Sequence, residues 1–573
     1  MERSAGVDTS LPSRRTTTTT AWEFEAKELD AQIAWHYAQI KILKAKRNAI
    51  VPLRRLPNEL LIQILTIFAV EAHSDALYNL KWSKIMKVCH HWHELIMAAQ
   101  HLWAYIDLKW KEKRLFDQLE RSGAAPLSIK LDVYDHSVHY IPYIMQVCTR
   151  IRELNFEGEA KSIFEFIASL PEADLPILSA LTLRVTMGLD RVPEGLPRNL
   201  PHSLFDGRLP RLRELTLASI AVPWSLLRGL TSLSLTETQD SSNSTPPTFS
   251  DLLDMLRACP QLSLLRLDDI CPPSSHHPCD AVYLPSLQAL RLRAFATSCQ
   301  ALLEHLHIPS NCTLSLFPSG LRSGAHIRGL LVPIRKHLRS PGAQTPLLLK
   351  LGRSGVTHCT TGFVASTVLP DMLFFDNIPL FLNCHPTSEG TLRQMLTKIL
   401  NAVPSDAITH LDGRWANVFQ PVTWRTVIAH LPSLEIIYLA LNHGAVNCLT
   451  ALCDIETIDP EHRIYPRIRR LHIRVLRLDE TDNTITELLT ILEEYLTALK
   501  RNGTVLERLE FDDDSYVLSY TAQDVRLQRM FALMEGEIIV GDRLYDPIER
   551  EKRIKAAEAR HKAWVIENGF EIQ

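Results

Sequence analysis

The stretch 87–96 (KVCHHWHELI) concentrates side chains that bind metals or transfer protons. Five of them fall within six consecutive residues: Cys89, His90, His91, His93 and Glu94. Cysteine and histidine are the usual protein ligands of zinc, and histidine beside glutamate is a common general acid–base pair. Whether either chemistry is feasible here depends on the secondary structure that carries these side chains.

A helical wheel argues against a metal site in this stretch. On a helix, His91 and His93 point about 160° apart, so one ion cannot bind both. Only His90 with His93 or Glu94 could share an ion. The spacing H-E-x-x-H would require a histidine where the chain has Met97. We therefore expect a solvated helix face, with no metal, cofactor or catalytic residue.

A second group of possible zinc ligands lies in a proline-rich stretch, at Cys271, His276, His277 and Cys279. The residue types suit zinc, but the spacing matches no structural zinc module. The prolines predict a stiff surface turn instead. The chain also contains no P-loop, G-x-G-x-x-G, G-x-S-x-G or C-x-x-C motif, so we expect a protein that is not an enzyme. The absence of a nucleophile motif likewise disfavours a hydrolase within residues 318–420.

Composition narrows the class of protein. A chain of 573 residues with 46% hydrophobic and 22% charged residues is long enough for two or more units. Its 62 basic and 65 acidic residues create no global field for nucleic acid, and no apolar run approaches the roughly 20 residues that cross a bilayer. Eleven scattered cysteines without a secretory segment predict reduced thiols in the cytoplasm or nucleus.

The N-terminal part reads as a polar tail followed by a long helix. Residues 1–20 are of low complexity and predict disorder. Residues 21–50 predict a charged helix with a heptad seam, formed by Leu29, Ile33, His36, Ile40, Leu43, Arg47 and Ile50. This seam could brace another element of the same chain or associate with a second copy, and the sequence leaves the oligomeric state open.

Two further helices follow. Pro57 suits a first helical turn, and the apolar residues behind it follow helical spacing: Leu60, Leu61, Ile64, Leu65 and Phe68. In the next helix, which would contain the stretch 87–96, the apolar residues all fall within about 60° of Trp92: Ile85, Val88, Cys89, Leu95 and Ile96. We expect both helices to bury one apolar face.

These residues resemble a known module. The pattern Leu56-Pro57-x-Glu59-Leu60 with Ile64, then Val88-Cys89-x-x-Trp92-x-x-Leu95, then Leu102-Trp103-x-x-Ile106, resembles the F-box, in particular its fungal form with a helix just ahead of it. The resemblance covers residues 51–108. The chain departs from the family in having Ile64-Leu65 where Ile-Phe is common, and in the long connector 71–83, so docking should weaken modestly.

The resemblance implies that the chain binds a Skp-type adaptor and, through it, a cullin. Leu56, Pro57, Leu60 and Ile64 would then lie on or near the adaptor-binding face. Val88, Trp92, Leu95 and Trp103 would contribute to the core and rim of the module, and we count Val88 and Trp92 among the adaptor-binding residues. The implied function is substrate recognition in a ubiquitin ligase; the alternative is a non-catalytic binding scaffold acting outside ubiquitination.

After Asp107 a phrase of the form L-x-x-L-x-L recurs. It is centred on Leu154, Leu181, Leu215, Leu265, Leu290, Ile437, Leu471 and Leu509, with a degenerate copy at Leu233. This pattern is typical of leucine-rich repeats, although its copies recur at irregular intervals that mostly exceed the usual spacing of about 20 to 29 residues. Two further segments could be degenerate copies of the pattern: LLLKLG (347–352) and DMLFFDN (371–377). Strands alternating with helices predict an α/β solenoid with a parallel sheet over 125–515, capped by a helical segment, 516–573.

Arginines recur at the outward positions of these strands. The set comprises Arg184, Arg266, Arg291, Arg293, Arg470 and Arg474. A continuous stripe of guanidinium groups would suit an unknown client protein that is acidic or phosphorylated. Ordinary solvation of strand arginines is the alternative interpretation.

Overall fold

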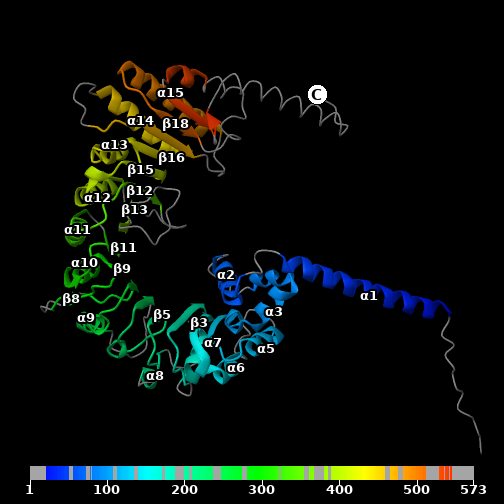
Figure 1. The fold of residues 1–573 in the computed structure, drawn as a ribbon. Helices are drawn as coiled ribbons and strands as arrows, with labels where there is room; N and C mark the ends of the chain where they lie inside the picture. The colour runs from blue at the N-terminus through cyan, green and yellow to red at the C-terminus, as the bar shows by residue number, and fades with distance from the viewer. Residues whose placement is uncertain are drawn as a thin grey trace, which may run out of the picture. The chain divides into compact units, whose positions relative to one another are not determined.

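The computed structural model describes residues 21–50, 56–71, 78, 80–107, 112–133, 140–170, 174–187, 199–205, 209–236, 247–273, 280–321, 324–353, 361–366, 380–384, 389–458, 465–474, 482–511, 528–534, 536–540 and 543–544. The chain divides into two compact units, Met1–Leu131 and Asp132–Gln573. Figure 1 traces both units along the chain. The predicted tail 1–20, the copy at 371–377 and most of the predicted C-terminal helix lie outside the described residues.

The first unit is mainly helical. It contains α1 (Ala21–Ala49), α2 (Asn58–Glu71), the 3-10 helix η2 (Lys81–Lys87), α3 (His90–Ala98), α4 (Gln100–Trp103), β1 (Tyr105–Asp107) and α5 (Glu112–Arg121). The helices α2, η2, α3 and α4 share a core of Leu61, Leu65, Trp82, Leu95, Ile96, Ala99, Leu102 and Trp103. The indole Nε1 of Trp103 donates a hydrogen bond to the carbonyl oxygen of Ile96 at 2.9 Å, which ties α4 to α3.

The second unit is built on the recurring leucine phrase. Its first strands run parallel in the order β3 (Ile151–Glu159), β4 (Ala180–Met187), β5 (Glu214–Ala218), β6 (Ser232–Thr236), β7 (Leu264–Asp268), β9 (Ala289–Phe295) and β11 (Thr313–Ser319). The central leucines are direct partners across this sheet: Leu154, Leu181, Leu215, Leu233, Leu265, Leu290 and Leu314. All are buried. The predicted parallel solenoid, including its degenerate copy at Leu233, is confirmed.

A second parallel block follows later in the chain. It contains β15 (His410–Trp415), β16 (Ile436–Ala440), β17 (Arg470–Arg474), β18 (Arg508–Phe511) and β19 (Glu537–Val540). Here the aligned central residues are Leu411, Ile437, Leu471, Leu509 and Ile538. A short antiparallel strand, β20 (Arg543–Leu544), pairs with β19 at the end of the described chain.

Helices of differing length connect the strands, which explains the irregular repeat interval. They are α6 (Ile141–Gln146), α7 (Ala160–Ser169), α8 (His202–Phe205), α9 (Phe249–Arg257), α10 (Ala296–His305), α11 (Gly324–Leu338), α12 (Glu389–Ala402), α13 (Pro421–Ala429), α14 (His443–Ile458) and α15 (Asp482–Arg501). In Figure 1, α10 to α13 lie on one side of strands β9 to β15. The side chains between the buried leucines point to the opposite face, because residues alternate along a strand.

The segment 318–420 departs from a simple repeat. The chain passes from β11 to β12 (Leu348–Arg353), which lies beside β15, and then returns through β13 (Thr361–Ser366) to β14 (Leu380–Cys384), which lies beside β11. Both pairings of β13 are antiparallel, so the predicted parallel sheet is interrupted locally in this segment. The predicted copy LLLKLG does form a strand, and its Leu349 is aligned with Leu411.

Candidate protein-binding surfaces

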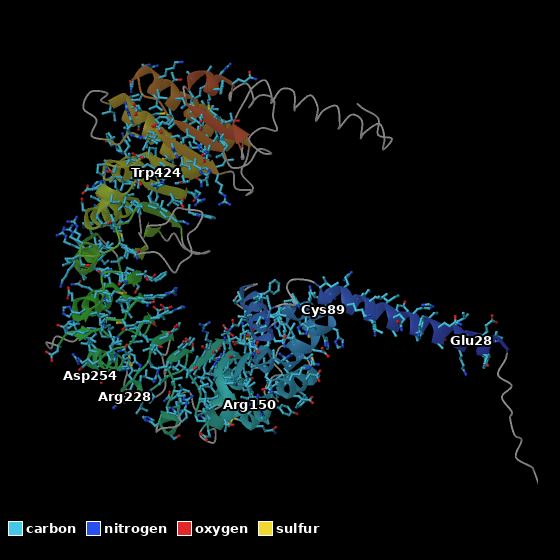
Figure 2. The ribbon with its side chains drawn as sticks, viewed as in Figure 1. Glu28, Cys89, Arg150, Arg228, Asp254 and Trp424 are labelled. Atoms are coloured by element: carbon cyan, nitrogen blue, oxygen red, sulfur yellow. The ribbon has the colours of Figure 1, made fainter. Side chains whose placement is uncertain are left out.

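The histidine-rich stretch does not form one continuous helix. The 3-10 helix η2 is followed by Val88, and Cys89 is extended (φ −161°, ψ 166°) before α3 begins at His90. The placement of Val88 on a buried helical face is therefore wrong, since its side chain is 60% exposed. A wheel at 100° per residue holds only while the helix is unbroken, and the extended residue resets the direction of the chain. Figure 2 labels Cys89 at this break.

The metal-capable groups of this stretch lie on the surface. The Nδ1 atom of His90 lies 3.2 Å from Oε2 of Glu94 one turn later, and both side chains are largely exposed. Within the part of the chain that the structure describes, no group of three or more histidine, cysteine, aspartate or glutamate residues is placed to hold a metal ion. In the proline-rich stretch, Cys271 is described, whereas His276, His277 and Cys279 lie outside the described residues.

Five described cysteines of the second unit are poor nucleophiles. Burial raises the pKa of each of four thiols to about 12: Cys271, Cys299, Cys312 and Cys453. Burial also raises the pKa of Cys448. The thiolate is the nucleophilic form, so these side chains stay protonated and unreactive at neutral pH.

Helix α2 has two apolar faces. Leu61 and Leu65 are buried in the core of the first unit. The other face is exposed and carries Leu60, Ile64, Ile67 and Phe68, which are between 45% and 54% exposed. Their spacing of four, seven and eight residues from Leu60 places them in one row along the helix, which we call the α2 stripe. A row of four large exposed apolar side chains on one helix is typical of a protein-binding surface.

The six predicted adaptor-binding residues fall in different environments. Leu60 and Ile64 belong to the α2 stripe. Leu56 is half-buried and Pro57 is exposed just before the helix begins. Val88 is exposed, while Trp92 is half-buried and packs against the core. The sequence prediction missed Ile67 and placed Phe68 on the same apolar face as the core residues. The helix is apolar nearly all the way round, and this pattern indicates that two of its faces need partners.

A shallow depression lies beside the stripe. It is lined by Glu59, Ile62, Gln63, Thr66, Ile67 and His101. The Oγ1 atom of Thr66 lies 3.1 Å from Nε2 of His101, so α2 and α4 meet at its floor. Burial lowers the pKa of His101, which favours its neutral ring at neutral pH. The depression combines an apolar wall with a few polar groups that could receive an inserted side chain.

Three of the predicted client-binding arginines lie together on β7 and β9. Arg266 and Arg291 are direct partners in the sheet. Both contact the buried carboxylate of Asp268: Nη2 of Arg266 lies 2.7 Å from Oδ2, and Nε of Arg291 lies 3.4 Å from Oδ1. The guanidinium groups of Arg291 and Arg293 lie 4.6 and 5.3 Å from the ring centroid of Phe317. We call these four polar residues and Phe317 the Asp268 cluster.

The remaining arginines do not extend this cluster into a stripe. Arg184 lies on β4, where its Nη1 atom is 4.0 Å from Oε2 of Glu157. Strands β5 and β6 separate it from β7. Arg470 and Arg474 lie on β17 in the second parallel block. The expectation of one continuous arginine stripe is wrong, because the repeats that carry these residues are not neighbours in the sheet.

A second polar row, which the sequence did not indicate, crosses the second block. Arg414 makes two hydrogen bonds to the fully buried Asp412, each 3.0 Å long, and Nζ of Lys350 lies 3.8 Å from the same carboxylate. On neighbouring strands, Tyr438 lies 5.3 Å from His472, centroid to centroid. The row ends at Glu510, whose Oε2 atom is 3.5 Å from Nδ1 of His472.

Comparisons with known proteins give a structural likeness only. No known family model and no curated protein matches the chain. A solved structure, the leucine-rich-repeat-containing protein LegL7 from Legionella pneumophila, is 14% identical, with a TM-score of 0.25; the match covers 69% of this chain and 93% of that chain. Among the described residues, no helix is both long and apolar enough to cross a membrane.

Proposed function

We propose that this chain is the client-recognition subunit of a Skp–cullin–F-box type ubiquitin ligase. The first unit would bind the adaptor, and the repeats of the second unit would bind a client protein. The chain would perform no chemistry itself. Its contribution would be proximity, because holding the client near a ubiquitin-loaded enzyme raises the effective concentration of the reacting groups.

The α2 stripe is the observation that carries the adaptor half of the proposal. The helix that follows Leu56-Pro57-x-Glu59-Leu60 buries Leu61 and Leu65 but leaves Leu60, Ile64, Ile67 and Phe68 exposed. Covering such side chains with a partner removes apolar area from water, which stabilises a complex by about 25 cal/mol per Å². Two of the residues that the F-box resemblance assigns to the adaptor, Leu60 and Ile64, therefore belong to this exposed apolar face.

The Asp268 cluster supports the client half of the proposal. Its arginines emerge on the sheet face opposite the connecting helices, and Arg293 is exposed. The buried Asp268 neutralises part of the charge of Arg266 and Arg291 and fixes their direction. An arginine held in this way loses less conformational freedom on binding an acidic or phosphorylated group. The client surface would thus combine fixed guanidinium groups with the face of Phe317.

Affinity purification of the tagged full-length chain tests the proposal. The wild-type chain should retain a Skp-type adaptor and a cullin. The variant Ile64→Glu with Phe68→Glu should lose both, because it places two charges in the apolar interface. The matched control is Val332→Glu on α11, where the side chain is 63% exposed and remote in sequence from the first unit. It should retain the adaptor.

Absence of the adaptor from the wild-type purification would overturn the ligase proposal. The remaining interpretation would then be a non-catalytic binding scaffold with an F-box-like module. Equal adaptor recovery with the wild-type chain and the α2 variant would instead remove the α2 stripe from the interface.

A further inference from the structure

Helix α1 presents an apolar seam that the described residues of the first unit leave exposed. Four seam residues are strongly exposed: Leu29 by 53%, Ile33 by 52%, Ile40 by 45% and Leu43 by 64%. Within the described part of the first unit, no element packs over these four side chains to act as the intramolecular brace. A heptad seam of this kind is stable in water when a second helix covers it.

The charges along α1 are segregated. The first half carries Glu23, Glu25, Glu28 and Asp30, with Lys27 as its single basic residue, and the second half carries Lys41, Lys44, Lys46 and Arg47. Two copies side by side in parallel would place acid against acid and base against base. Two copies in antiparallel orientation would place the acidic half of each against the basic half of the other.

We propose that α1 mediates homodimerisation of this protein through an antiparallel coiled coil with α1 of a second copy. In the register that overlaps the two helices over almost their full length, Leu29 packs against Ile40 of the second copy, and Ile33 packs against His36 of the second copy. The helix has 29 residues, so at 1.5 Å per residue the contact would extend over about 40 Å.

The polar residues of the seam favour the same orientation. In a parallel, in-register pair, each polar seam residue meets its own counterpart, so His36 would face His36 and Arg47 would face Arg47. The antiparallel register separates both like pairs. His36 then lies against an aliphatic neighbour, and Arg47 lies near Trp22 of the second copy, whose ring can accept a cation on its face.

The residues that flank the seam complete the match. In the antiparallel register Glu25 lies beside Lys46 of the second copy, and each dimer contains this pair twice. In a parallel pair Glu25 would lie beside Asp30 of the second copy and repel it. Replacing Glu25 with lysine should therefore weaken an antiparallel dimer and strengthen a parallel one.

Sedimentation equilibrium of the full-length chain tests the inference. The wild-type chain should sediment as a dimer in reversible equilibrium with the monomer. Ile33→Glu should be monomeric, because it places a charge at the centre of the seam. Ile33 is exposed in the single chain, so the melting temperature of the monomeric variant should match that of the wild-type monomer at high dilution.

Charge reversal tests the orientation. Glu25→Lys alone or Lys46→Glu alone should raise the dimer dissociation constant about tenfold, since each variant makes two attractive pairs repulsive. The double variant should return the constant to within about threefold of the wild-type value. Glu28→Lys makes the same charge change and serves as the control, because the heptad spacing places Glu28 away from the second helix. Figure 2 labels Glu28 on α1, and the dissociation constant of this variant should stay close to that of the wild type.

A wild-type chain that remains monomeric at the highest concentration would overturn the inference. Tighter association of Glu25→Lys would indicate parallel helices and overturn the proposed orientation. Neither result depends on adaptor binding, so failure here is distinguishable from failure of the proposed ligase function.

Discussion

The indole ring of Trp424 occupies the space that a Cβ atom at Gly413 would need. Gly413 lies in β15, between Asp412 and Arg414, where the register with β12 shifts. Trp424 comes from α13 and is fully buried. Figure 2 labels Trp424 in this part of the second unit. The helix and the strand therefore approach so closely that only glycine fits at this position.

Gly413→Ala should lower the free energy of unfolding by about 1–3 kcal/mol, because the added methyl group must displace a large buried ring. Chemical denaturation followed by tryptophan fluorescence measures this change. Gly390→Ala is the control: Gly390 lies in α12, and nothing lies within 4 Å of the Cβ position. It should leave stability unchanged or raise it by up to about 1 kcal/mol. Equal effects of the two changes would contradict the close approach.

Asp412→Asn should destabilise the second unit by about 3–5 kcal/mol. The substitution removes the negative charge that the nearly buried guanidinium of Arg414 contacts through two hydrogen bonds, and a buried charge is costly when its counter-charge is lost. Asp254→Asn removes one partner of a surface pair with Arg257 and should cost less than about 1 kcal/mol. Urea unfolding of both variants gives the comparison, and similar losses would argue against a special role for the Asp412 pair.

Arg291→Glu with Arg293→Glu should abolish client binding and leave adaptor binding intact. The change reverses two charges beside Phe317, on a unit separate from the α2 stripe. Arg257→Glu on α9 is the control, since it reverses a charge on a connecting helix. Quantitative proteomics of proteins cross-linked to the tagged chain measures recovery. Unchanged recovery with the double variant would exclude the Asp268 cluster as a client surface.

Stability should fall as the pH is lowered below about 6.5. Burial lowers the pKa values of His337 and His410 in the folded protein below the ordinary histidine value of about 6.5. Between that value and the lower folded pKa, the unfolded chain binds protons that the folded chain does not. Protonation therefore favours unfolding over this window, by at most about 1.4 kcal/mol per pH unit for each histidine.

His337→Gln tests the contribution of one ring. Nε2 of His337 lies 2.9 Å from the carbonyl oxygen of Cys312, and the amide of glutamine can donate to the same acceptor without titrating. The urea midpoint of the variant should change less than that of the wild type between pH 7.5 and 5.5. An identical pH dependence would show that His337 does not contribute.

The recurring leucine pattern predicted the repeats well, because the burial of the leucines produces both the sequence pattern and the alignment of the strands. Each central leucine must be buried, and strands in a parallel stack align their buried residues, as with Leu154, Leu181 and Leu215. Local spacing was therefore enough to locate the strands. The degenerate copy at Leu233 was also identified, because Leu230, Leu233 and Leu235 keep the spacing L-x-x-L-x-L.

Other features depend on information that local spacing does not contain. The break at Cys89 follows from an extended residue that a helical wheel cannot represent. To predict the exposed face of α2, one must know which apolar residues of this helix fit into the core of the first unit. The row at Asp412 lies in a strand, HLDGRW, in which Leu411 is the single large apolar side chain among the four buried residues. The placement of β14 beside β11 is a long-range pairing between segments that share no sequence signal.

The antiparallel turn-back of β12, β13 and β14 has a consequence for how the second unit unfolds. In a stack of repeats each strand is stabilised mainly by its immediate neighbours, so cooperativity is transmitted from one repeat to the next. The first strands, from β3 through β7 and β9 to β11, and the strands β15 to β19 each form an unbroken parallel run. Among the described residues, the strand pairings that join the two runs pass through the turn-back. Because the junction is the one place where the described sheet turns antiparallel between the runs, we expect unfolding that begins in one run to pause there, so that the two runs behave as separate cooperative units, or foldons, of one continuous sheet.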